Sequence, residues 1–451
     1  MKRILNNLSP RNLTPPTYLN PNHQADENLT TSLYAFTPSL LTHDLYIQLA
    51  DLLLKQDFET ATHIAEVRDL TEIFYLTDTY QKTLLMFAVE GGNTALIRFL
   101  LSNAIDPDAL ASMKDFVGRT ALITAGRSGH TESIKVILGS VHFPEQHIYE
   151  YDHFHCTALM TAAQVGNPES IKVLLSMASN PDTLAGMRDS SGRTALMYAA
   201  MAGNAESIKA ILSGVKYPED LACMRDADGN TTLILAASRN NAESIKALLS
   251  NVNNATQLAF MKNQDDYNAL MLAAFDGSTE TIHALLNHVK NPIELIYFSN
   301  DSGTTALMLC AQNENIDDLD SNVITVMLNI AMKIRDTNYR MSPQYKKGKH
   351  AYISLEPDSL IFQTDINGKN AFMISAEESN DLALLTLFNW TTDKLALLKQ
   401  ENKNQCPTVD LLDPDQCDSL INLLEKQKLS ECVHNADVVL SLLQKQQAHF
   451  L

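Results

Sequence analysis

The stretch Thr194–Ala200, with the sequence TALMYAA, decides how this chain folds. Close copies of it start at positions 120, 157, 231 and 268, and looser copies start at positions 83 and 305. These seven starts are spaced by 37 residues throughout, and a fixed period of this size is typical of a solenoid, in which similar units stack in a row. An eighth copy starts at Asn370, one period plus 28 residues after Thr305, so an insertion interrupts the array.

Two further features recur around each copy. An acidic turn with glycine, such as Asp189–Gly192, precedes it, and a second apolar segment, such as Gly203–Leu212, starts nine residues after it. This order resembles the ankyrin repeat, in which a turn with Asp and Gly leads into a Thr-Pro-Leu-His-like helix, a glycine turn and a second helix. The resemblance covers about residues 80–400 and implies an all-α ankyrin-repeat solenoid with helical caps at both ends.

The chain departs from the family pattern in three ways. Alanine replaces the usual proline, and Met or Ile replaces the usual histidine, so the family's Thr–His hydrogen bond is not available in that form. The period also exceeds the usual value of about 33 residues. The added residues include segments such as Asp106–Leu110 and Asn180–Leu184, in which a capping residue is followed by proline, an acid and leucine. We therefore expect an added short helix between units. Leucines would hold it against the stack, backed by core-filling methionines: Leu110, Leu184, Leu221, Leu258 and Leu295, with Met113, Met187, Met224 and Met261.

Composition excludes several classes of protein. The net charge of −19 argues against general binding to nucleic acid or to acidic membranes. The sequence contains no run of about 18 apolar residues, so no membrane span is predicted. The six cysteines follow no paired framework, which favours reduced thiols and a cytosol-like compartment. Asn and Pro follow the basic start of the chain, where a signal peptide would need an apolar stretch.

The order of segments along the chain predicts a repeat array between two caps. The N-terminal arm is rich in Asn, Pro and Thr, and the cap that follows contains two amphipathic helices, 44–55 and 58–67; an F-box-like adaptor helix at 38–54 is the alternative. In the insertion, 351–355 and 360–363 read as strands of a small hairpin. The full division is an extended or disordered arm at 1–39, an N-terminal helical cap at 40–79, seven repeats at 80–334, a basic insertion at 335–364, an eighth repeat at 365–400 and a degenerate C-terminal helical cap at 401–451.

No motif for phosphate binding, a catalytic triad or a zinc hydrolase is present, and we expect no cofactor and no bound metal. One cluster keeps an enzyme reading open. Cys417, Cys432 and His434 lie in the C-terminal cap, with Cys406 just before them, and a Cys–His nucleophile or zinc site is the alternative to buried helix cysteines. Their spacing matches no known ligand pattern.

Two other clusters have a binding reading beside a plain surface reading. The segment 153–156 is His-Phe-His-Cys, and His155 stands where neighbouring units have Gly118 and Gly192, so this unit is predicted to abandon the usual glycine turn. An aromatic contact patch, a metal site and an irregular loop all remain open there. Lys346, Lys347 and Lys349 form a basic patch that is either simply solvated or docks an acidic partner or anionic lipid.

The resemblance implies that protein partners bind to the turn tips and to the concave face of the inner helices. The family's variable contact positions lie between the turn Asp and the helix Thr, and just after the Ala-Ala pair. Arginines recur among them, predicted exposed, and they favour a partner with an acidic surface. The positions are Phe116, Arg119, Arg127, His153, Phe154, Gln164, Arg193, Met201, Arg239, Tyr267 and Phe275.

The leading prediction is therefore a monomeric, non-enzymatic interaction scaffold. The sequence, rich in Asn, Gln and Lys, also looks like effectors that intracellular bacteria inject through type IV secretion, which implies action in the cytosol of a host cell. The polar end at 444–451, closing on Phe450 and Leu451, is compatible with a translocation signal. The alternative function is an effector enzyme with a small catalytic module in the insertion or the C-terminal segment.

Overall fold

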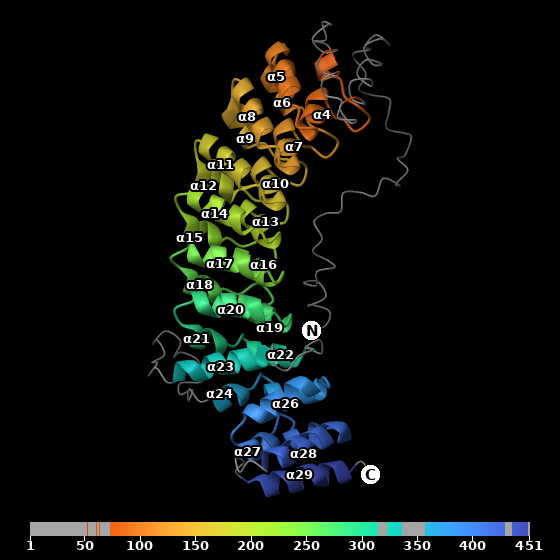
Figure 1. Cartoon of the computed structure of the whole chain (residues 1–451), viewed down its shortest axis with the longest axis vertical. Helices are drawn as coiled ribbons and strands as arrows, with labels where there is room; N and C mark the ends of the chain where they lie inside the picture. Colours follow the sequence, from red (N-terminus) through yellow and green to blue (C-terminus); the bar gives the residue numbers. More distant parts are fainter. Residues whose placement is uncertain are drawn as a thin grey trace. The chain divides into compact units, whose positions relative to one another are not determined.

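The computed structural model describes residues 73–313, 323–335, 357–428 and 435–449, together with Leu52, Thr60 and His63. Within these ranges the chain is helical and contains no β-strand (Figure 1). No helix among them has the length and hydrophobicity needed to cross a membrane. The predicted N-terminal arm and the basic run at Lys346, Lys347 and Lys349 lie outside the described residues. Of the helices predicted at 44–55 and 58–67, and of the F-box-like alternative at 38–54, only the single residues Leu52, Thr60 and His63 are described.

Each repeat contains three helices, and eight such sets follow one another along the chain. The inner helices are α4 (Leu84–Glu90), α7 (Ala121–Ser128), α10 (Ala158–Val165), α13 (Ala195–Met201), α16 (Thr232–Ala237), α19 (Ala269–Phe275), α22 (Ala306–Ala311) and α25 (Ala371–Glu377). The outer helices are α5 (Thr94–Asn103), α8 (Thr131–Ser140), α11 (Pro168–Met177), α14 (Ala205–Gly214), α17 (Ala242–Ser250), α20 (Thr279–His288), α23 (Val323–Arg335) and α26 (Asp381–Trp390). The third helices are α6 (Pro107–Ser112), α9 (Pro144–Ile148), α12 (Pro181–Gly186), α15 (Pro218–Ala222), α18 (Ala255–Phe260), α21 (Pro292–Ile296), α24 (Pro357–Ile361) and α27 (Lys394–Lys399).

The start of each inner helix is fixed by the residue that opens the repeated stretch. Thr194 is extended, and its hydroxyl accepts a hydrogen bond from the backbone N–H of Met197 at 3.4 Å. The same N-cap bond is made by Thr120, and Asn268 makes it with a side-chain amide oxygen. The hydroxyl thus satisfies a backbone donor that an isolated helix would leave open, which explains why the repeat keeps Thr or Asn without the family's histidine.

A tight turn precedes each inner helix and positions the candidate site. We call these five-residue segments finger turns. In the fourth, Asp189 accepts hydrogen bonds from the backbone N–H groups of Ser191 at 2.9 Å and Arg193 at 2.7 Å. The fourth residue of each is left-handed, with φ of 76° at Gly192 and 62° at His155. The finger turns are 78–82, 115–119, 152–156, 189–193, 226–230, 263–267, 300–304, 365–369 and 402–406.

The prediction that the third repeat abandons its turn at His155 is therefore wrong. Asp152 accepts from the backbone N–H groups of Phe154 and Cys156, both at 2.9 Å, so the turn closes as in the other repeats. The ring of Tyr151 packs edge-on against that of His155, with centroids 4.8 Å apart. A residue with a side chain adopts this conformation at a cost in strain, which the two Asp152 hydrogen bonds offset.

The third helix explains most of the period beyond 33 residues, and its acids link neighbouring repeats. Asp182 in α12 accepts from the backbone N–H groups of Lys216 and Tyr217, which lead into α15. Glu145 in α9 does the same for Ser179. The predicted short helices are confirmed, and their five leucines are buried. The methionines proposed as core filler, Met113, Met187, Met224 and Met261, are only half-buried.

One expectation for the insertion is wrong. Leu360 and Ile361 belong to the helix α24 rather than to a strand, and Leu360 is buried. Pro357 starts this helix 13 residues before Asn370, the spacing that separates Pro144 from Thr157, so α24 is the third helix of the seventh repeat. The other predicted strand, at 351–355, lies outside the described residues.

The C-terminal segment still follows the repeat for one more turn. Asn402 accepts from the backbone N–H groups of Asn404 and Cys406, and Gln405 is left-handed. Pro407 then stands where Asn370 caps α25, and a short 3-10 helix, η3 (Thr408–Leu411), replaces an inner helix. The helices α28 (Pro414–Lys428) and α29 (Ala436–Ala448) pack together after it, and η1 (Ile73–Tyr75) precedes the first finger turn.

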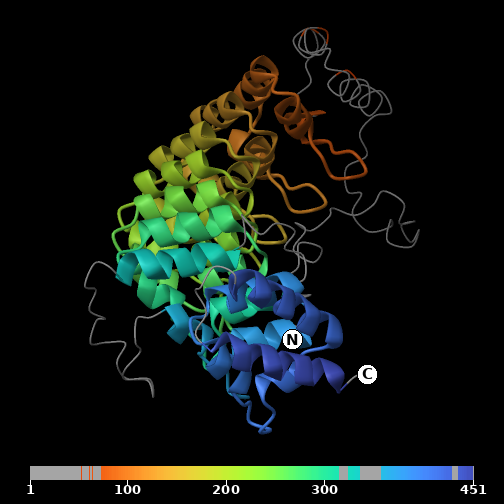
Figure 2. The same ribbon diagram turned by 60° about the horizontal axis from the view of Figure 1, so that its bottom comes forward.

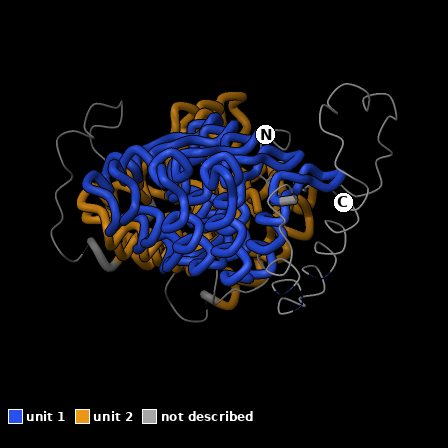
Figure 3. Tube along the Cα trace, turned by 90° about the horizontal axis from the view of Figure 1, so that it is seen from above, with its two compact units in different colours: residues 1–232 blue, residues 233–451 orange. Residues whose placement is uncertain are grey.

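The chain divides into two compact units, residues 1–232 and 233–451 (Figure 3). In unit 1 the inner helices α4, α7, α10 and α13 pack in sequence, as do the outer helices α5, α8, α11 and α14. In unit 2 the same order holds for α19, α22 and α25, and for α17, α20, α23 and α26. The core of each unit is made of the Leu, Ile and Ala positions of the repeat, with Leu196 fully buried.

Candidate protein-interaction surface

Backbone hydrogen bonds join the finger turns of unit 1 into one row. The N–H of Phe116 donates to the carbonyl of Tyr80 at 2.9 Å, and the N–H of His153 donates to the carbonyl of Val117 at 3.0 Å. Ser190 with Phe154, and Ala227 with Ser191, continue the series at 2.8 Å. Figure 2 shows the turns of the first repeats, orange to yellow, projecting on the same side of the unit. Side chains on successive tips are therefore held next to one another by the backbone.

The first three of these tips each expose an aromatic ring. Tyr80 is 64% exposed, Phe116 60% and Phe154 39%. The fourth and fifth tips carry small residues instead, Ser190, Ser191 and Ala227. Exposed aromatic rings cost hydration free energy and are enriched at protein interfaces. The aromatic row of Tyr80, Phe116 and Phe154 is the strongest contact feature of unit 1.

Basic side chains stand directly before three of the five turns of the row. Lys114, Arg188 and Arg225, each directly before a turn aspartate, are exposed. Lys114 donates to the carbonyl of Tyr151 at 2.8 Å, and its ammonium lies 5.5 Å from the Tyr151 ring centre. Arg188 donates to the carbonyl of Arg225 at 3.0 Å. These partners are neutral, so they orient the cations without cancelling their charge.

The aspartates of the finger turns face inward. Asp115, Asp152, Asp189 and Asp226 are all less than a tenth exposed. Burial raises the pKa of Asp152 and of Asp226, in spite of the backbone N–H groups that donate to them. Their carboxylates therefore stabilise the turns and present little negative charge at the surface, which leaves the basic residues prominent.

The structure divides the sequence-predicted contact residues into three groups. Phe116, Arg127, His153 and Phe154 are exposed. Gln164, Met201, Arg239 and Phe275 are half-buried. Tyr267 is buried at 6% exposed, which contradicts its prediction as an accessible contact residue. The first group lies on or beside the finger row, and it is the part of the predicted set that unit 1 brings together.

The predicted exposure of the finger arginines is also wrong. The side chain of Arg119 is 14% exposed and forms an ion pair with Asp115 at 2.6 Å. That of Arg193 is 13% exposed and lies 4.0 Å from Asp226. Each arginine folds back on a turn aspartate, because the buried carboxylate has one oxygen left over after accepting the backbone N–H groups. These two arginines hold the turns more than they face a partner.

Sequence reasoning missed Tyr80, Lys114, Arg188 and Arg225. Tyr80 falls in the first finger turn, which the sequence division split between cap and repeat. The other three stand one residue before the turn aspartate, outside the contact positions carried over from the family. Their common register was the available signal, since the same position holds a base in three of the five units of the row.

The outer helices α8, α11 and α14 each carry one acid and one base, and these pair with each other. Lys135 in α8 contacts Glu132 at 2.6 Å, and the Lys209–Glu206 pair in α14 is 2.7 Å long. All are well exposed and separated by three residues, a spacing that brings the two side chains together on one helix face. This surface is self-neutralised.

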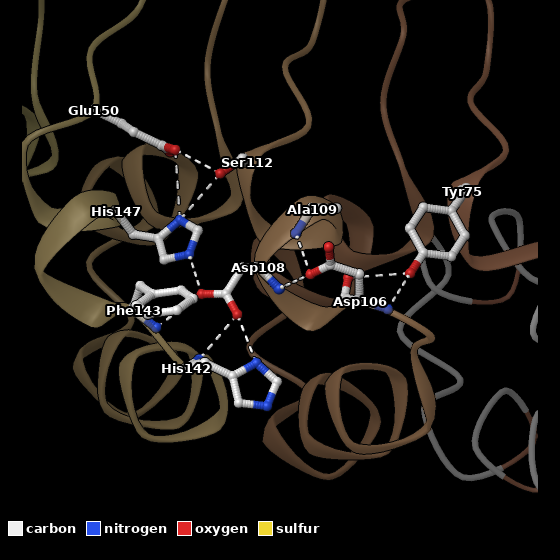
Figure 4. A network of polar contacts seen from close by, with 9 residues as sticks. All are labelled: Tyr75, Asp106, Asp108, Ala109, Ser112, His142, Phe143, His147 and Glu150. Atoms are coloured by element: carbon white, nitrogen blue, oxygen red, sulfur yellow. Dashed lines mark hydrogen bonds and ion pairs between the residues drawn. The ribbon is translucent and has the colours of Figure 1, made fainter.

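The closest approach to a chemical site in unit 1 is a polar network between α6 and α9 (Figure 4). His147, only 2% exposed, has Nε2 at 3.1 Å from Asp108 and Nδ1 at 3.5 Å from Glu150. Burial lowers the pKa of His147, but the hydrogen bonds with Glu150 and Asp108 outweigh burial and raise it. Burial raises the pKa of Asp108, yet the N–H groups of Phe143 and His142 and the two histidine rings hold it well below its usual range. The network joins two repeats, and nothing in it is aligned for attack on a substrate.

The two described thiols of the C-terminal cluster, Cys406 and Cys417, have raised pKa values. Cys417 is buried, and burial raises its pKa to about 11. The pKa of Cys406 is raised as well. A thiol rather than a thiolate is a weak nucleophile at neutral pH. Cys432 and His434 lie outside the described residues. Within those residues, no group of three or more His, Cys, Asp or Glu side chains is placed to hold a metal ion.

Three-helix units that stack in register and carry a row of hydrogen-bonded turns define a helical-repeat protein. Models of the ankyrin repeats (3 copies) match residues 45–145, 141–221, 159–259, 216–294 and 233–330. These segments together span more than half of the sequence, and the chain belongs to the ankyrin-repeat family. Repeats of this family bind protein partners and are typically non-enzymatic.

Among solved structures, the ankyrin repeat domain of Bcl-3, described as a unique member of the IkappaB protein family, is similar to this chain. The identity is 17% and the TM-score 0.41, and the match covers 50% of this chain and 92% of that chain. A search of curated proteins finds no match.

Proposed function

We propose that this chain is a scaffold that holds a partner protein against the finger turns of unit 1 and the adjoining ends of its inner helices. The observation that carries the proposal is the aromatic row on three adjacent, hydrogen-bonded tips. Aromatic residues supply large contact area at low cost in conformational entropy, and they dominate interface hot spots. A row fixed by its own backbone binds without first having to order itself.

The other exposed face of the repeats supports the same choice by contrast. Displacing the Glu–Lys pairs of α8, α11 and α14 would require a partner to replace interactions that the chain already makes. The finger row offers exposed rings, and at Lys114 and Arg188 it offers cations that are bound to neutral carbonyls. A partner with an acidic surface fits this row, because the charge steers association.

The experiment compares two pairs of aromatic substitutions in the full chain. Phe116→Ser with Phe154→Ser removes two rings of the aromatic row. Phe143→Ser with Tyr217→Ser removes two exposed rings that precede third helices, where Phe143 is 59% and Tyr217 is 52% exposed. Proteins captured by the wild type from host-cell extract, and then tested as purified components, should lose affinity about tenfold or more for the first variant only. Equal binding by both variants and the wild type would reject the proposal.

The setting of this function is also part of the proposal. The scaffold acts as a monomer in a reducing cytosol, and the resemblance of the sequence to secreted effectors supports a host cell as the site of action. None of the five described cysteines is in a disulfide, which supports a reducing compartment. A translocation reporter fused to the N-terminus, with and without residues 444–451, tests the secretion step: export that does not depend on this tail contradicts a C-terminal signal.

A further inference from the structure

A base that stands directly before a finger turn has a different environment in the two units. In unit 2, Lys262 stands before Asn263 and forms ion pairs with Asp266 and, at 3.0 Å, with Asp301. In unit 1 the equivalent Lys114 and Arg188 direct their charged groups to backbone carbonyls. A carbonyl dipole orients a cation but leaves its full charge in place. The finger row of unit 1 therefore keeps positive charge that the same position in unit 2 has lost.

The tips of the finger turns also carry more exposed acidic residues in unit 2 than in unit 1. In unit 2, Asp265 and Asp301 project from the finger turns, and the side chain of Asp301 is 91% exposed. In unit 1, Asp228 is the only fully exposed acid among the described finger turns, and it lies at the end of the row away from the aromatic tips. The chain as a whole is strongly acidic. Among the exposed charged side chains of the row, the bases Lys114, Arg188 and Arg225 therefore outnumber the acid Asp228, on a molecule that is acidic as a whole.

Rings and cations occur together along this region, with Lys114 before the second turn and Arg188 before the fourth. The tips of turns 78–82, 115–119 and 152–156 present Tyr80, Phe116 and Phe154, while Lys114 and Arg188 flank the turns that follow the first. A ligand that satisfies both must carry apolar side chains and carboxylates at short intervals. Because a backbone hydrogen bond joins each tip to the next, the tips follow one another in a line, which suits a chain segment that lies along it in extended form.

We propose that the finger turns of unit 1 bind an extended acidic segment of the partner in which aromatic side chains alternate with carboxylates. This inference rests on the proposed function and names the chemistry of the partner. The carboxylates lie against Lys114, Arg188 and Arg225, and the apolar side chains lie on the aromatic row. The charges raise the association rate and make binding sensitive to salt, and the rings supply the desolvated contact.

The test uses fluorescence anisotropy of the full chain with a labelled copolymer of glutamate and tyrosine in a 4:1 ratio. Polyglutamate and polylysine are the comparison probes. The variant Lys114→Glu/Arg188→Glu/Arg225→Glu changes three exposed finger residues. The matched control Lys135→Glu/Lys172→Glu/Lys209→Glu makes the same charge change on α8, α11 and α14. Circular dichroism checks that both variants keep the helicity of the wild type.

The expected order of binding is copolymer, then polyglutamate, with no binding of polylysine to the finger row. The finger variant should lose at least about tenfold in affinity for the copolymer and most of its salt dependence, while the control loses about twofold or less. Equal losses in the two variants would mean that only net charge matters, and equal affinity in all three proteins would mean that the row does not bind acidic chains; either result overturns the inference.

The two proposals fail separately. If the finger variant binds the copolymer like the wild type, but Phe116→Ser with Phe154→Ser still loses the partner, the acidic segment is wrong and the scaffold function stands. If the aromatic variant keeps its partner, the scaffold surface itself is wrong. The milder variant Lys114→Gln/Arg188→Gln/Arg225→Gln should lose an intermediate amount of affinity for the copolymer, because it removes the cations without adding repulsion.

Discussion

The finger row and the outer helices of unit 1 are built from the same repeats, and both contain acidic and basic residues. They differ in which of these residues are exposed and in which are paired. On the outer helices Glu206 and Lys209 both lie in solvent and pair with each other. On the finger row Asp189 is buried in its turn, while Arg188 remains outside. The charges present in a repeat therefore do not tell which face is available to a partner. That depends on which charged side chains accept hydrogen bonds from the backbone.

The physical reason is the tight turn. Two backbone N–H groups point into each finger turn and must find an acceptor. One inward-facing carboxylate or amide oxygen accepts hydrogen bonds from both N–H groups, so the aspartate stabilises the turn and does not face solvent. A helix surface has no such unmet donors, and its acids stay in solvent.

The largest expected effect comes from Leu196→Ala, because Leu196 lies fully buried beneath both surfaces. The cavity should cost about 2–5 kcal/mol of unfolding free energy, measured by chemical denaturation. Hydrogen exchange should increase in the third and fourth repeats of unit 1 together, since stacked units share their interfaces. An increase confined to the fourth repeat would contradict this coupling.

The second effect separates the finger aspartate from the outer acids. Asp189→Ala removes the acceptor of two backbone N–H groups and of the Tyr198 hydroxyl, which donates to Asp189 at 2.7 Å. Leaving buried donors unsatisfied should cost about 1–3 kcal/mol.

Asp189→Asn is the matched control, because Asn263, Asn300 and Asn402 fill this position in other turns through one amide oxygen. Asp189→Asn should lower the free energy of unfolding clearly less than Asp189→Ala does. If the two variants lose equal stability, the turn depends on charge and not on the acceptor.

The repeat array was readable from the sequence, but the surface was only partly so. The period and the Thr N-cap define where each inner helix begins, so the helix pairs and the short third helices were predicted correctly. His155 and Leu360 were misread for one reason. A glycine-free turn and a short apolar run look irregular in isolation, and only the register of neighbouring repeats shows that both are ordinary repeat positions.

The contact residues were harder, since exposure depends on partners that a sequence does not show. Arg119 and Phe116 stand three residues apart in one turn, and the sequence treats them alike. In the structure Asp115 draws the arginine inward, whereas no neighbour covers Phe116. Lys114 was overlooked because the family pattern starts at the aspartate.

The third effect depends on pH and tests the polar network between α6 and α9. The raised pKa of His147 means that its contribution to stability is complete below its ordinary value of 6.5 and is lost as pH rises through the higher folded value. The lowered pKa of Asp108 means that its contribution is complete above 3.8 and is lost as pH falls toward its folded value. Each pKa unit corresponds to about 1.4 kcal/mol.

The melting temperature should therefore be highest between these two ordinary values and should fall on the alkaline side. The variant His147→Gln cannot carry the charge, so its decline on raising the pH through neutrality should be smaller than that of the wild type. His153→Gln, on the exposed finger row, is the control and should keep the wild-type slope. Identical slopes in all three proteins would show that His147 is not charged between its carboxylates.

The smallest effect is expected on the outer helices. Glu206→Gln breaks an exposed pair three residues apart and should change the unfolding free energy by about 0.3–0.5 kcal/mol or less. High salt should remove even this difference. A loss comparable with that of Asp189→Ala would erase the contrast between the two surfaces.

The most direct test of the finger row as the binding surface places a photo-reactive phenylalanine analogue at Phe116 or at Phe143. The two side chains are equally accessible, at 60% and 59% exposed, but Phe116 is on the row and Phe143 precedes the third helix α9. On illumination in host-cell extract, the chain labelled at Phe116 should form a discrete cross-linked species that the chain labelled at Phe143 lacks. Cross-linking at Phe143 with none at Phe116 would contradict the account.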